Sequence, residues 1–418
     1  MEIVRNRYLN KLIDRKENGL VKVITGIRRC GKSYLLFHLY RDKLVSMGVA
    51  KDHIIALALD DIANIEYRDA IKLYSYVKNI IKDDDMHYVF LDEIQMMTSN
   101  FTDLINGLLH IDNLDIYVTV SNSKFLSSDI LTEFRGHGDE VRVYPLSFAE
   151  FTTAYDNTST AWKDYYTYGG LPLILSRNTD ELKAEYLISL FNNIYLKDIK
   201  ERNNIKTDDE IDILVDIVAS ATGSLTNPTK LSNSFKSMSQ KSLSDKTIKL
   251  YLDYLSEAFL IEKSVRFDVK GKKYIDTPAK YYFEDIGLRN ARLNFRQQEE
   301  NHIMENIIYT ELRSRGYRVD VGVVETYEAS NEGKRERKLL EIDFIANKGD
   351  KKYYIQSAFE MSSSEKIIQE KKSLTKLKDF FKRIVVVKDD IKPRTDEQGI
   401  VTIGIFDFLL NENILEQI

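Results

Sequence analysis

Two short segments carry residue types suited to phosphate chemistry, and the first runs from Gly26 to Ser33. It reads G-I-R-R-C-G-K-S and has the spacing G-x-x-x-x-G-K-S. Glycines at this spacing let a loop curl so that backbone N–H groups point at phosphates, while the lysine places a cation on the outer phosphates and the serine hydroxyl can ligate Mg²⁺. The segment predicts a nucleotide-binding loop whose contacts come from Gly26, Arg28, Arg29, Cys30, Gly31, Lys32, Ser33 and Tyr34.

The second segment, His87 to Glu93, reads H-Y-V-F-L-D-E. A continuous apolar run is typical of a strand buried in a parallel sheet, and the carboxyl end of such a strand opens onto the ligand crevice. We expect Asp92 to hold Mg²⁺ through water and Glu93 to orient and polarise the attacking water. The two segments together predict ATP and Mg²⁺ as cofactors, with Ser33 and Asp92 at the metal and Lys32 and Glu93 as catalytic residues.

A further polar strand end, T-V-S-N-S from residue 119, is expected between the two motifs. A side chain at this position can hydrogen-bond the γ-phosphate or the attacking water. Asn122 is the first candidate for this catalytic role, and Ser121 and Ser123 are alternatives.

Arg135 lies in the glycine-rich stretch L-T-E-F-R-G-H-G-D. An exposed arginine here could reach the γ-phosphate held by a neighbouring subunit and neutralise charge in the transition state. The alternative is a surface arginine paired with Glu133 or Asp139. Arg28 and Arg29 also have two interpretations: they either add positive field at the nucleotide or pair with acidic groups in the helical lid.

The elements around these residues alternate between apolar strand-like runs and helical patterns up to about Phe151, which predicts a doubly wound parallel sheet. Helices are expected at Tyr34–Val45 and Phe101–His110. The fold class is therefore α/β, of the P-loop NTPase type. The expected strands are Val21–Thr25, Ile54–Leu59, Tyr88–Leu91, Ile116–Val120 and Val141–Tyr144.

Three further regions follow the predicted ATPase core of residues 1–153. Residues 154–206 form a helical lid in this prediction, and residues 207–294 contain three helices and a basic hairpin, the pattern of a winged helix-turn-helix that contacts DNA. A module of this kind that serves only packing or oligomer contacts is the alternative. Residues 295–418 alternate again, with a solvated charged turn expected at Glu332–Lys338 and a lysine-rich helix at Glu365–Phe381.

Composition narrows the class of protein. A chain of 418 residues is too long for a single hydrophobic core and predicts several domains. Its content of 43% hydrophobic and 30% charged residues is ordinary for a soluble globular protein. The N-terminal residues lack a secretory h-region and no stretch is apolar enough to span a bilayer, so we expect a cytoplasmic protein with no membrane segment. The lone Cys30 excludes an internal disulfide framework, and a net charge of −5 requires any nucleic-acid surface to be a local patch.

The motifs G-I-R-R-C-G-K-S, Y-V-F-L-D-E-I-Q, S-N-S-K-F-L-S and V-Y-P-L-S-F-A-E-F closely resemble bacterial and archaeal AAA-type ATPases of the AAA_14 kind. The later stretches A-K-Y-Y-F-E-D-I-G-L-R-N and H-I-M-E-N-I-I-Y-T-E-L-R-S-R-G-Y resemble the DUF4143 region that follows the ATPase in that family. The resemblance covers nearly the whole chain and implies an AAA+-like core, a winged helix and a terminal domain like that of restriction endonucleases.

Sites of the endonuclease kind use an acid on one strand, an acid and a lysine two apart on the next strand, and a helix glutamate; the carboxylates bind Mg²⁺. The resemblance places the helix glutamate at Glu305 and the strand acid at Asp343, but the second pair falls on Q-S-A from Gln356. Alanine cannot replace the lysine charge, and a lysine from elsewhere, such as Lys366 or Lys371, is the alternative. We expect a degenerate site without nuclease activity.

The sequence thus predicts a Mg²⁺-dependent ATPase that assembles into a homo-oligomer, with Arg135 of one subunit completing the site of the next. Hydrolysis would move the winged helix and terminal domain, with DNA as a partner. One alternative is a slow nucleotide-gated switch that binds a protein partner, and a second is an ATP-powered nuclease.

Overall fold

The computed structural model describes residues 2–98, 100–122, 138–206, 208–297, 299–329, 335–361 and 363–418. The chain divides into two compact units. The first comprises Met1–Pro145 together with Leu171–Leu173 and Glu257–Phe259, and the second comprises the remaining residues from Leu146 to Ile418. The predicted division into four domains is finer and stays a prediction.

The first unit is built on a five-stranded sheet in the order β2-β3-β4-β1-β5, with every neighbouring pair parallel. The predicted parallel α/β sheet is therefore confirmed. Because β4 lies between β1 and β3, residues at its carboxyl end separate the loop after β1 from the acids after β3. The strands are β1 Val21–Thr25, β2 Ile54–Ala58, β3 His87–Asp92, β4 Leu114–Val120 and β5 Gly138–Arg142.

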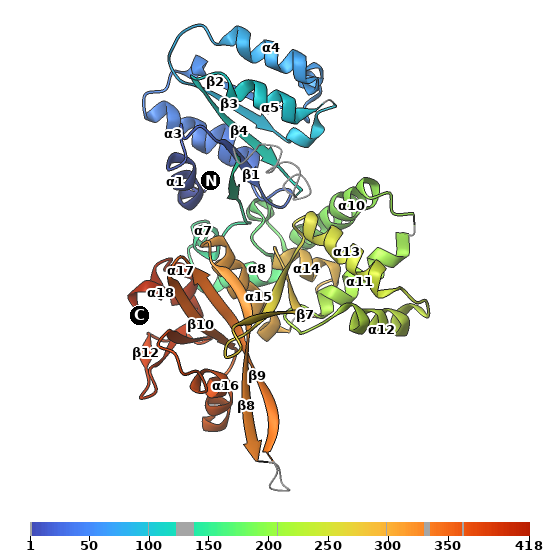
Figure 1. The fold of residues 1–418 in the computed structure, drawn as a ribbon, viewed down its shortest axis with the longest axis vertical. Helices are drawn as coiled ribbons and strands as arrows, with labels where there is room; N and C mark the ends of the chain where they lie inside the picture. Colours follow the sequence, from blue (N-terminus) through green and yellow to red (C-terminus); the bar gives the residue numbers. More distant parts are fainter. Residues whose placement is uncertain are drawn as a thin grey trace. The chain divides into compact units, whose positions relative to one another are not determined.

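Helices cover both faces of this sheet (Figure 1). On one face, α4 and α5 pack against alternate strand residues in a core that includes Leu73, Leu91 and Leu104. On the other face, Tyr40 contacts the rings of Phe90 and Tyr117. The helical segments are α1 Asn6–Ile13, α2 Lys32–Tyr34, the π-helical η1 Leu35–Tyr40, α3 Arg41–Ser46, η2 Lys51–His53, η3 Ile62–Arg68, α4 Ala70–Ile80, η4 Ile94–Met96 and α5 Phe101–Leu109.

The second unit begins with helices, as the sequence pattern from residue 154 predicts. The region predicted as a winged helix contains three helices followed by an antiparallel hairpin, β6 Ile261–Asp268 and β7 Lys273–Phe283. The helices of this part are α7 Phe148–Thr152, α8 Thr158–Tyr168, η6 Pro172–Ser176, α9 Asp180–Leu190, η7 Phe191–Leu196, α10 Lys197–Arg202, α11 Asp208–Ser220, α12 Pro228–Ser239, α13 Asp245–Glu257 and α14 Ile286–Arg292.

An eight-stranded mixed sheet, β12-β13-β11-β10-β9-β8-β6-β7, organises the rest of the second unit. The hairpin belongs to this sheet because β6 pairs in parallel with β8 at residues 266–268. The succession α15, β8, β9, β10, α16 and β11 has antiparallel neighbours up to β10 and a parallel β11. The elements are α15 Glu300–Ser314, β8 Arg318–Ala329, β9 Arg335–Lys348, β10 Lys351–Ala358, α16 Ser364–Thr375, β11 Lys382–Val387, β12 Arg394–Thr395, β13 Ile400–Gly404, α17 Ile405–Leu410 and α18 Ile414–Gln417.

Two local predictions for this unit were wrong. Residues 335–338, expected in a solvated turn, belong to β9 and pair with residues 326–329 of β8, because sheet pairing satisfies their backbone while the charges stay exposed. The lysine-rich helix ends at Thr375 rather than Phe381. After its end, the Arg383 side chain donates to the carbonyl oxygens of Leu377 and Asp379. These carbonyls are therefore bonded by a side chain and not by the N–H groups of a continuing helix.

Among the residues that the structure describes, no helix has both the length and the apolar character that crossing a bilayer requires.

Candidate nucleotide site and a second carboxylate site

The loop after β1 has a backbone that only glycine fits at two positions. Gly26 has a φ of 144°, and a Cβ built there would lie 2.0 Å from the carbonyl oxygen of Val143. Gly31 adopts the left-handed region at φ 100°, directly before the helix that starts at Lys32. Positive φ costs glycine no steric penalty, so both residues are required by the path of the chain.

Lys32 is buried at the start of this helix, and its ammonium rests on the loop backbone. Lys32 Nζ donates to the carbonyl oxygens of Gly26 at 2.9 Å and Ile27 at 3.1 Å. The helix N-terminus adds free N–H groups and the positive end of the helix dipole. The loop therefore presents one cation and a set of backbone donors to an anion.

The loop is held from outside by Arg5, which sequence reasoning missed. Arg5 is buried just before α1, and its Nη1 donates to the Cys30 carbonyl at 3.0 Å while its Nη2 donates to the Tyr144 carbonyl at 2.8 Å. Cys30 Sγ also donates to the Val143 carbonyl at 3.4 Å. These bonds join α1, the phosphate loop and the chain after β5. No local motif marks Arg5, because its partners are distant carbonyl groups.

Asp92 lies buried at the end of β3 and faces the loop. Burial raises the pKa of Asp92, and the neighbouring Glu93 carboxylate adds to this rise. Hydrogen bonds from Thr119 and Ser33 and the charge of Lys32 act in the opposite direction. The structure therefore brings Lys32, Ser33 and Asp92 together, as the two sequence motifs predict.

Glu93 adopts a left-handed backbone, with φ and ψ both 53°, which is uncommon for a residue other than glycine and is found at functional sites. Its N–H donates to Thr119 Oγ1 at 2.9 Å, while Thr119 Oγ1 donates to Asp92 Oδ1. Glu93 Oε2 accepts from Ser121 Oγ at 3.0 Å and from the Gln95 amide. Thr119 and Gln95 were missed, although Thr119 opens the polar strand end that the sequence identified.

The other predicted nucleotide residues have different surroundings. Arg28 is half-buried and its Nε donates to Ser121 Oγ at 3.4 Å. Arg29 is exposed at a positive φ of 64°. Tyr34 is exposed and stacks on His38, and Asn122 is buried two residues after the end of β4. Ser123 and Arg135, together with Glu133, lie outside the described residues.

The second unit contains a buried carboxylate cluster around a lysine. Lys280 of β7 is 2% exposed, and its Nζ lies 2.8 Å from Glu305 Oε1, 2.7 Å from Glu341 Oε1 and 3.2 Å from Asp343 Oδ1. Tyr282 OH donates to Glu305 Oε1 at 2.7 Å, and the N–H of Ser357 donates to Asp343 Oδ2 at 2.9 Å. Glu305 and Asp343, predicted as the two acids of an endonuclease-like site, are therefore neighbours.

Lys280 lies among Glu305, Glu341 and Asp343 and brings to them the positive charge that the Q-S-A segment lacks. Of the two alternative lysines, the charge of Lys366 acts on Glu370, the partner of Gln356. Lys366 pairs with Glu360 and Lys371 pairs with Asp396. Gln356 hydrogen-bonds Glu370, whose pKa is raised by burial and by the Asp343 charge. Gln356 Oε1 is buried and has no hydrogen-bond partner among the described residues.

The cluster keeps more negative than positive charge. Burial raises the pKa of Glu305 to about 7, and the Asp343 charge adds to this rise while Lys280 opposes it. The carboxyl groups of Glu305, Glu341 and Asp343 surround one ammonium, so full ionisation of these three acids leaves a net charge of −2. A buried imbalance of this size favours protonation or a bound cation.

Comparison with known proteins assigns the chain to a family. Residues 18–152 match the AAA_14 family model, described as an AAA domain. An uncharacterized protein of Haemophilus influenzae is 34% identical over 415 residues, covering 98% of each chain. The chain belongs to the same family as this protein. The uncharacterized protein MJ1544 of Methanocaldococcus jannaschii is 30% identical over 373 residues, which cover 85% of this chain and 77% of that protein.

A second family model, DUF8612, matches residues 159–299 and is described as a domain of unknown function. The sequence resemblance suggested DUF4143 for the C-terminal region, and the family matched there is a different one. Among solved structures, the Walker-type ATPase PABY2304 of Pyrococcus abyssi has a TM-score of 0.51 at 14% identity, covering 70% of this chain and 96% of that one. The fold of residues 18–152 is thus that of an AAA-type P-loop ATPase.

Proposed function

We propose that the protein is a Mg²⁺-dependent ATPase whose hydrolysis drives a conformational change. The observation that carries this proposal is the meeting of Lys32, Ser33, Asp92 and Glu93 at the carboxyl ends of β1 and β3. An anion-binding loop that faces two acids is suited to a nucleoside triphosphate and its metal ion. The AAA-domain match and the Walker-type fold support the same function.

The residues divide the work of phosphoryl transfer. Lys32 would exchange the carbonyl oxygens of Gly26 and Ile27 for the outer phosphates, since an ammonium binds charged oxygens more strongly than neutral carbonyls. Ser33 and Asp92 are the residues that would hold Mg²⁺, which neutralises charge developing on the phosphates. Glu93 would polarise the attacking water after leaving its bonds with Ser121 and Gln95.

Single substitutions test the ATPase proposal. Lys32→Ala should lower the rate of ATP hydrolysis by roughly a hundredfold or more, and Glu93→Gln should retain ATP binding while losing turnover. Lys43→Ala, on the exposed surface of the same helical stretch, is the matched control and should hydrolyse ATP at the wild-type rate. Wild-type hydrolysis by Lys32→Ala would refute the proposal. Turnover that is slow in every variant would favour the nucleotide-gated switch instead.

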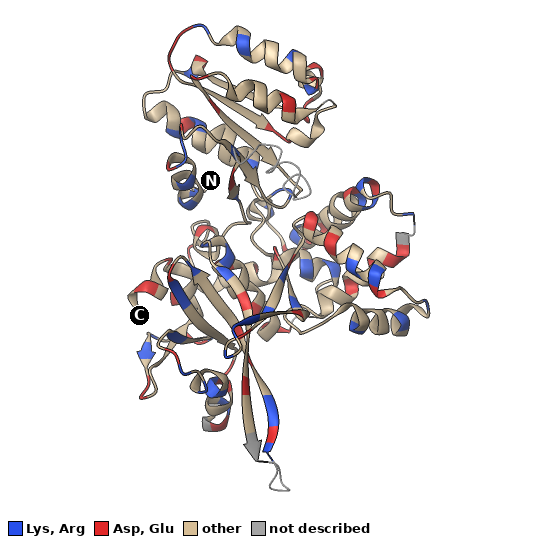
Figure 2. Ribbon diagram, in the orientation of Figure 1, with Lys and Arg blue, Asp and Glu red and all other residues tan. Residues whose placement is uncertain are grey.

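The second unit offers a surface for nucleic acid. Between Pro228 and Leu250, five lysines are exposed and Asp245 is the sole acidic residue (Figure 2). Lysines on a short stretch can neutralise backbone phosphates, which makes binding strongly salt-dependent. This patch consists of Lys230, Lys236, Lys241, Lys246 and Lys249.

DNA engagement through this patch is tested by the salt dependence of binding to a labelled duplex. Replacing Lys236, Lys246 and Lys249 by glutamine should weaken binding for every sequence and flatten the slope of affinity against salt. Replacing Lys43 by glutamine serves again as the control.

The proposal also includes assembly into a homo-oligomer, with Arg135 of one subunit acting on the nucleotide of the next. Arg135→Ala should then lower the rate of ATP hydrolysis, while wild type and variant have the same mass in solution.

A second candidate function is metal-dependent cleavage of a phosphodiester. The placement of Lys280 among Glu305, Glu341 and Asp343 favours it, because a lysine near two metal-binding acids can position the attacking water. The orphan Gln356 Oε1 fits a metal ligand on the adjacent strand. Incubation of plasmid and single-stranded DNA with Mg²⁺ or Mn²⁺ tests this function. Cleavage that is lost in both Asp343→Ala and Lys280→Met would support it, and absence of cleavage would leave the ATPase proposal standing alone.

A further inference from the structure

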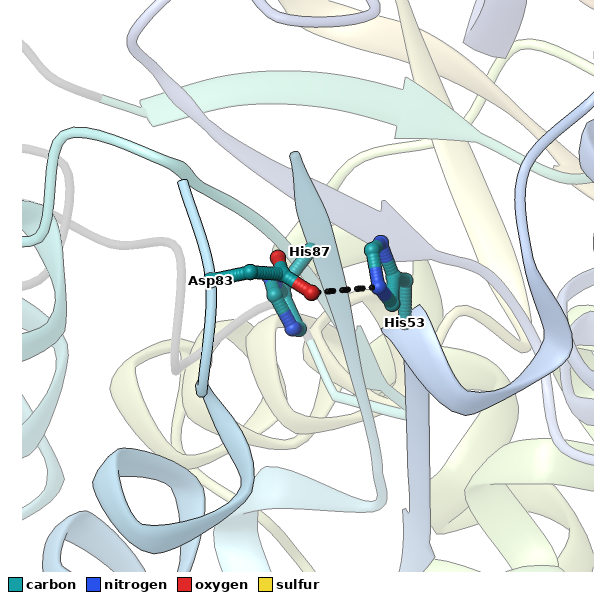
Figure 3. Close-up of side chains that lie close together, drawn as sticks. All are labelled: His53, Asp83 and His87. Atoms are coloured by element: carbon teal, nitrogen blue, oxygen red, sulfur yellow. Dashed lines mark ion pairs between the residues drawn. The ribbon is translucent and has the colours of Figure 1, made fainter. Parts of the chain in front are cut away.

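We propose that His53, Asp83 and His87 form a binding site for a divalent transition metal, with Zn²⁺ as the best-matched ion. The three side chains come from η2, from the loop before β3 and from the start of β3 (Figure 3). Each offers one ligand atom, and these atoms all lie within 4.8 Å of one another. Neither the proposed ATPase chemistry nor the second carboxylate site uses any of them.

Strand register brings the two histidines together. Because β2 and β3 run in parallel with Ile54 opposite Tyr88, the residues one position earlier, His53 and His87, also lie side by side. Neighbouring strands are about 4.8 Å apart, and the two imidazole rings stack with centroids separated by 4.3 Å. The pairing is thus fixed by the sheet rather than by flexible side chains.

The backbone around the histidines prepares His87 as a ligand. His87 Nδ1 lies 2.8 Å from the Asp85 carbonyl oxygen, which can only accept a hydrogen bond, so Nδ1 carries the hydrogen and the Nε2 lone pair can face a metal. A carbonyl in this position is the usual outer partner of a metal-bound imidazole. The Asn113 amide donates to the carbonyl oxygens of both Asp83 and Asp85, at 2.9 and 3.1 Å. Asn113 therefore orders the loop that carries the carboxylate.

The distances and ligand types select the ion. Zn²⁺ with ligands at about 2.1 Å in a tetrahedron places neighbouring ligand atoms about 3.4 Å apart. His53 Nε2 and Asp83 Oδ2 are already 3.2 Å apart. Asp83 Oδ1 accepts from the Asp85 N–H at 3.1 Å, so Oδ2 is the oxygen left for the metal. Two imidazoles and one carboxylate suit Zn²⁺ better than Mg²⁺, which prefers oxygen ligands. Water completes the fourth position, as in other sites with three protein ligands.

The location indicates what the metal does. His87 begins β3 and Asp92 ends it, so the metal site lies about 16 Å from the nucleotide site at the rise of an extended strand. The metal would tie the starts of β2 and β3 to the loop before β3. We therefore assign it a structural effect on the first unit, separate from ATP hydrolysis.

The test uses the full chain without a histidine tag and measures binding of Zn²⁺ alone by calorimetry, with Co²⁺ as a spectroscopic probe. One Zn²⁺ per chain and the intense visible absorption of tetrahedral Co²⁺ are expected. Asp83→Asn, a change at an exposed position that should leave the fold intact, and His53→Gln should each weaken binding at least roughly tenfold. Asn113→Ala should weaken it by roughly tenfold through the loop, and His110→Gln, at an exposed position, is the matched control.

Equal Zn²⁺ affinity in wild type, Asp83→Asn and His53→Gln would overturn the assignment, as would octahedral Co²⁺ absorption. Binding that is lost in those variants and kept in His110→Gln would support it. ATP hydrolysis by Asp83→Asn, measured with Mg²⁺ as the only divalent ion, should equal that of wild type. Failure of the ATPase proposal would therefore be seen in Lys32→Ala and not in this experiment.

Discussion

Replacing Lys280 by methionine removes the positive charge at the centre of the buried carboxylate cluster while keeping a side chain of similar length. The ammonium lies within 3.2 Å of oxygen atoms from Glu305, Glu341 and Asp343. Taking away one partner of a buried ion pair leaves the other charges uncompensated, and this typically costs roughly 3–5 kcal/mol. We expect Lys280→Met to lower the free energy of unfolding of the second unit by this amount at pH 8.

The loss should depend on pH in a defined direction. In the wild type, burial raises the pKa of Glu305 to about 7 from an ordinary 4.5. Without the ammonium the pKa of Glu305 is higher still, because Lys280 is the group that favours the ionised form. In the variant, Glu305 therefore takes up its proton at a pH above 7, whereas in the wild type it does so only near pH 7. The difference in stability between wild type and variant should shrink as the pH falls from 8 toward about 7 and then stay nearly constant down to pH 5.

The single tryptophan makes the assay specific to the second unit. Trp162 of α8 packs against Phe148 and Phe406, with ring centroids 5.4 and 5.8 Å away. Its fluorescence during urea denaturation reports on the unit that also contains Lys280. Lys263→Met is the matched control, since Lys263 pairs at the surface with Asp276, which is 74% exposed. Surface ion pairs contribute about 0–1 kcal/mol.

Two results would refute this reasoning. If Lys280→Met loses no more free energy of unfolding than Lys263→Met, the lysine does not stabilise the carboxylate cluster, for example because the acids are already protonated at pH 8. A loss that grows on acidification would contradict the direction of the Glu305 titration. Addition of Mg²⁺ should restore part of the stability of Lys280→Met if the carboxylates can take a divalent ion in place of the ammonium.

Three further predictions concern single side chains. Because the folded protein binds a proton at Glu305 more tightly than the unfolded chain does, stability should fall by up to about 3 kcal/mol as the pH rises from 4.5 to about 7; Glu305→Gln should remove this slope in urea titrations at several pH values. Gly26→Ala should abolish binding of a fluorescent ATP analogue, since the new Cβ meets a backbone carbonyl oxygen at 2.0 Å, whereas Gly107→Ala in α5 meets only ring atoms of Tyr74 at 3.4 and 3.5 Å and should bind normally. Ser121→Ala removes one of the two hydrogen bonds that Glu93 must leave before it can polarise water, and it should raise kcat by up to roughly tenfold with little change in KM.

What the sequence could predict was local along the chain. The phosphate loop depends on glycines whose φ values and close contacts are set within a few residues, so its spacing alone identified it. The strand that ends at Asp92 is buried at every residue, and its apolar run made that visible. The polar end of the strand before Ser121 was expected between the two motifs, and the place of β4 between β1 and β3 confirms this expectation.

What the sequence could not predict depends on partners brought together by the fold. Arg5 bonds carbonyl groups, which every residue possesses, so no residue type reveals its partners. Thr119 bridges Asp92 and Glu93 only because of the order of the strands. Lys280 did leave a trace, as a lysine inside the buried run A-K-Y-Y-F at the end of β7. A charged residue in a buried run needs a partner, but that partner could not be identified before Glu305 and Asp343 were placed in space.

The two lysines explain why the two sites make different demands on a bound ion. Lys32 donates its hydrogen bonds to the backbone carbonyls of Gly26 and Ile27. Within the described part of the chain, neither Asp92 nor Glu93 forms an ion pair with a lysine ammonium. That arrangement keeps the cation available for an anionic ligand and leaves the acids available for a metal. Lys280 instead bonds the acids themselves, and the second site is partly neutralised from within. A divalent ion at the second site must therefore share its carboxylates with Lys280 or displace it, whereas at the first site it enters together with the phosphates.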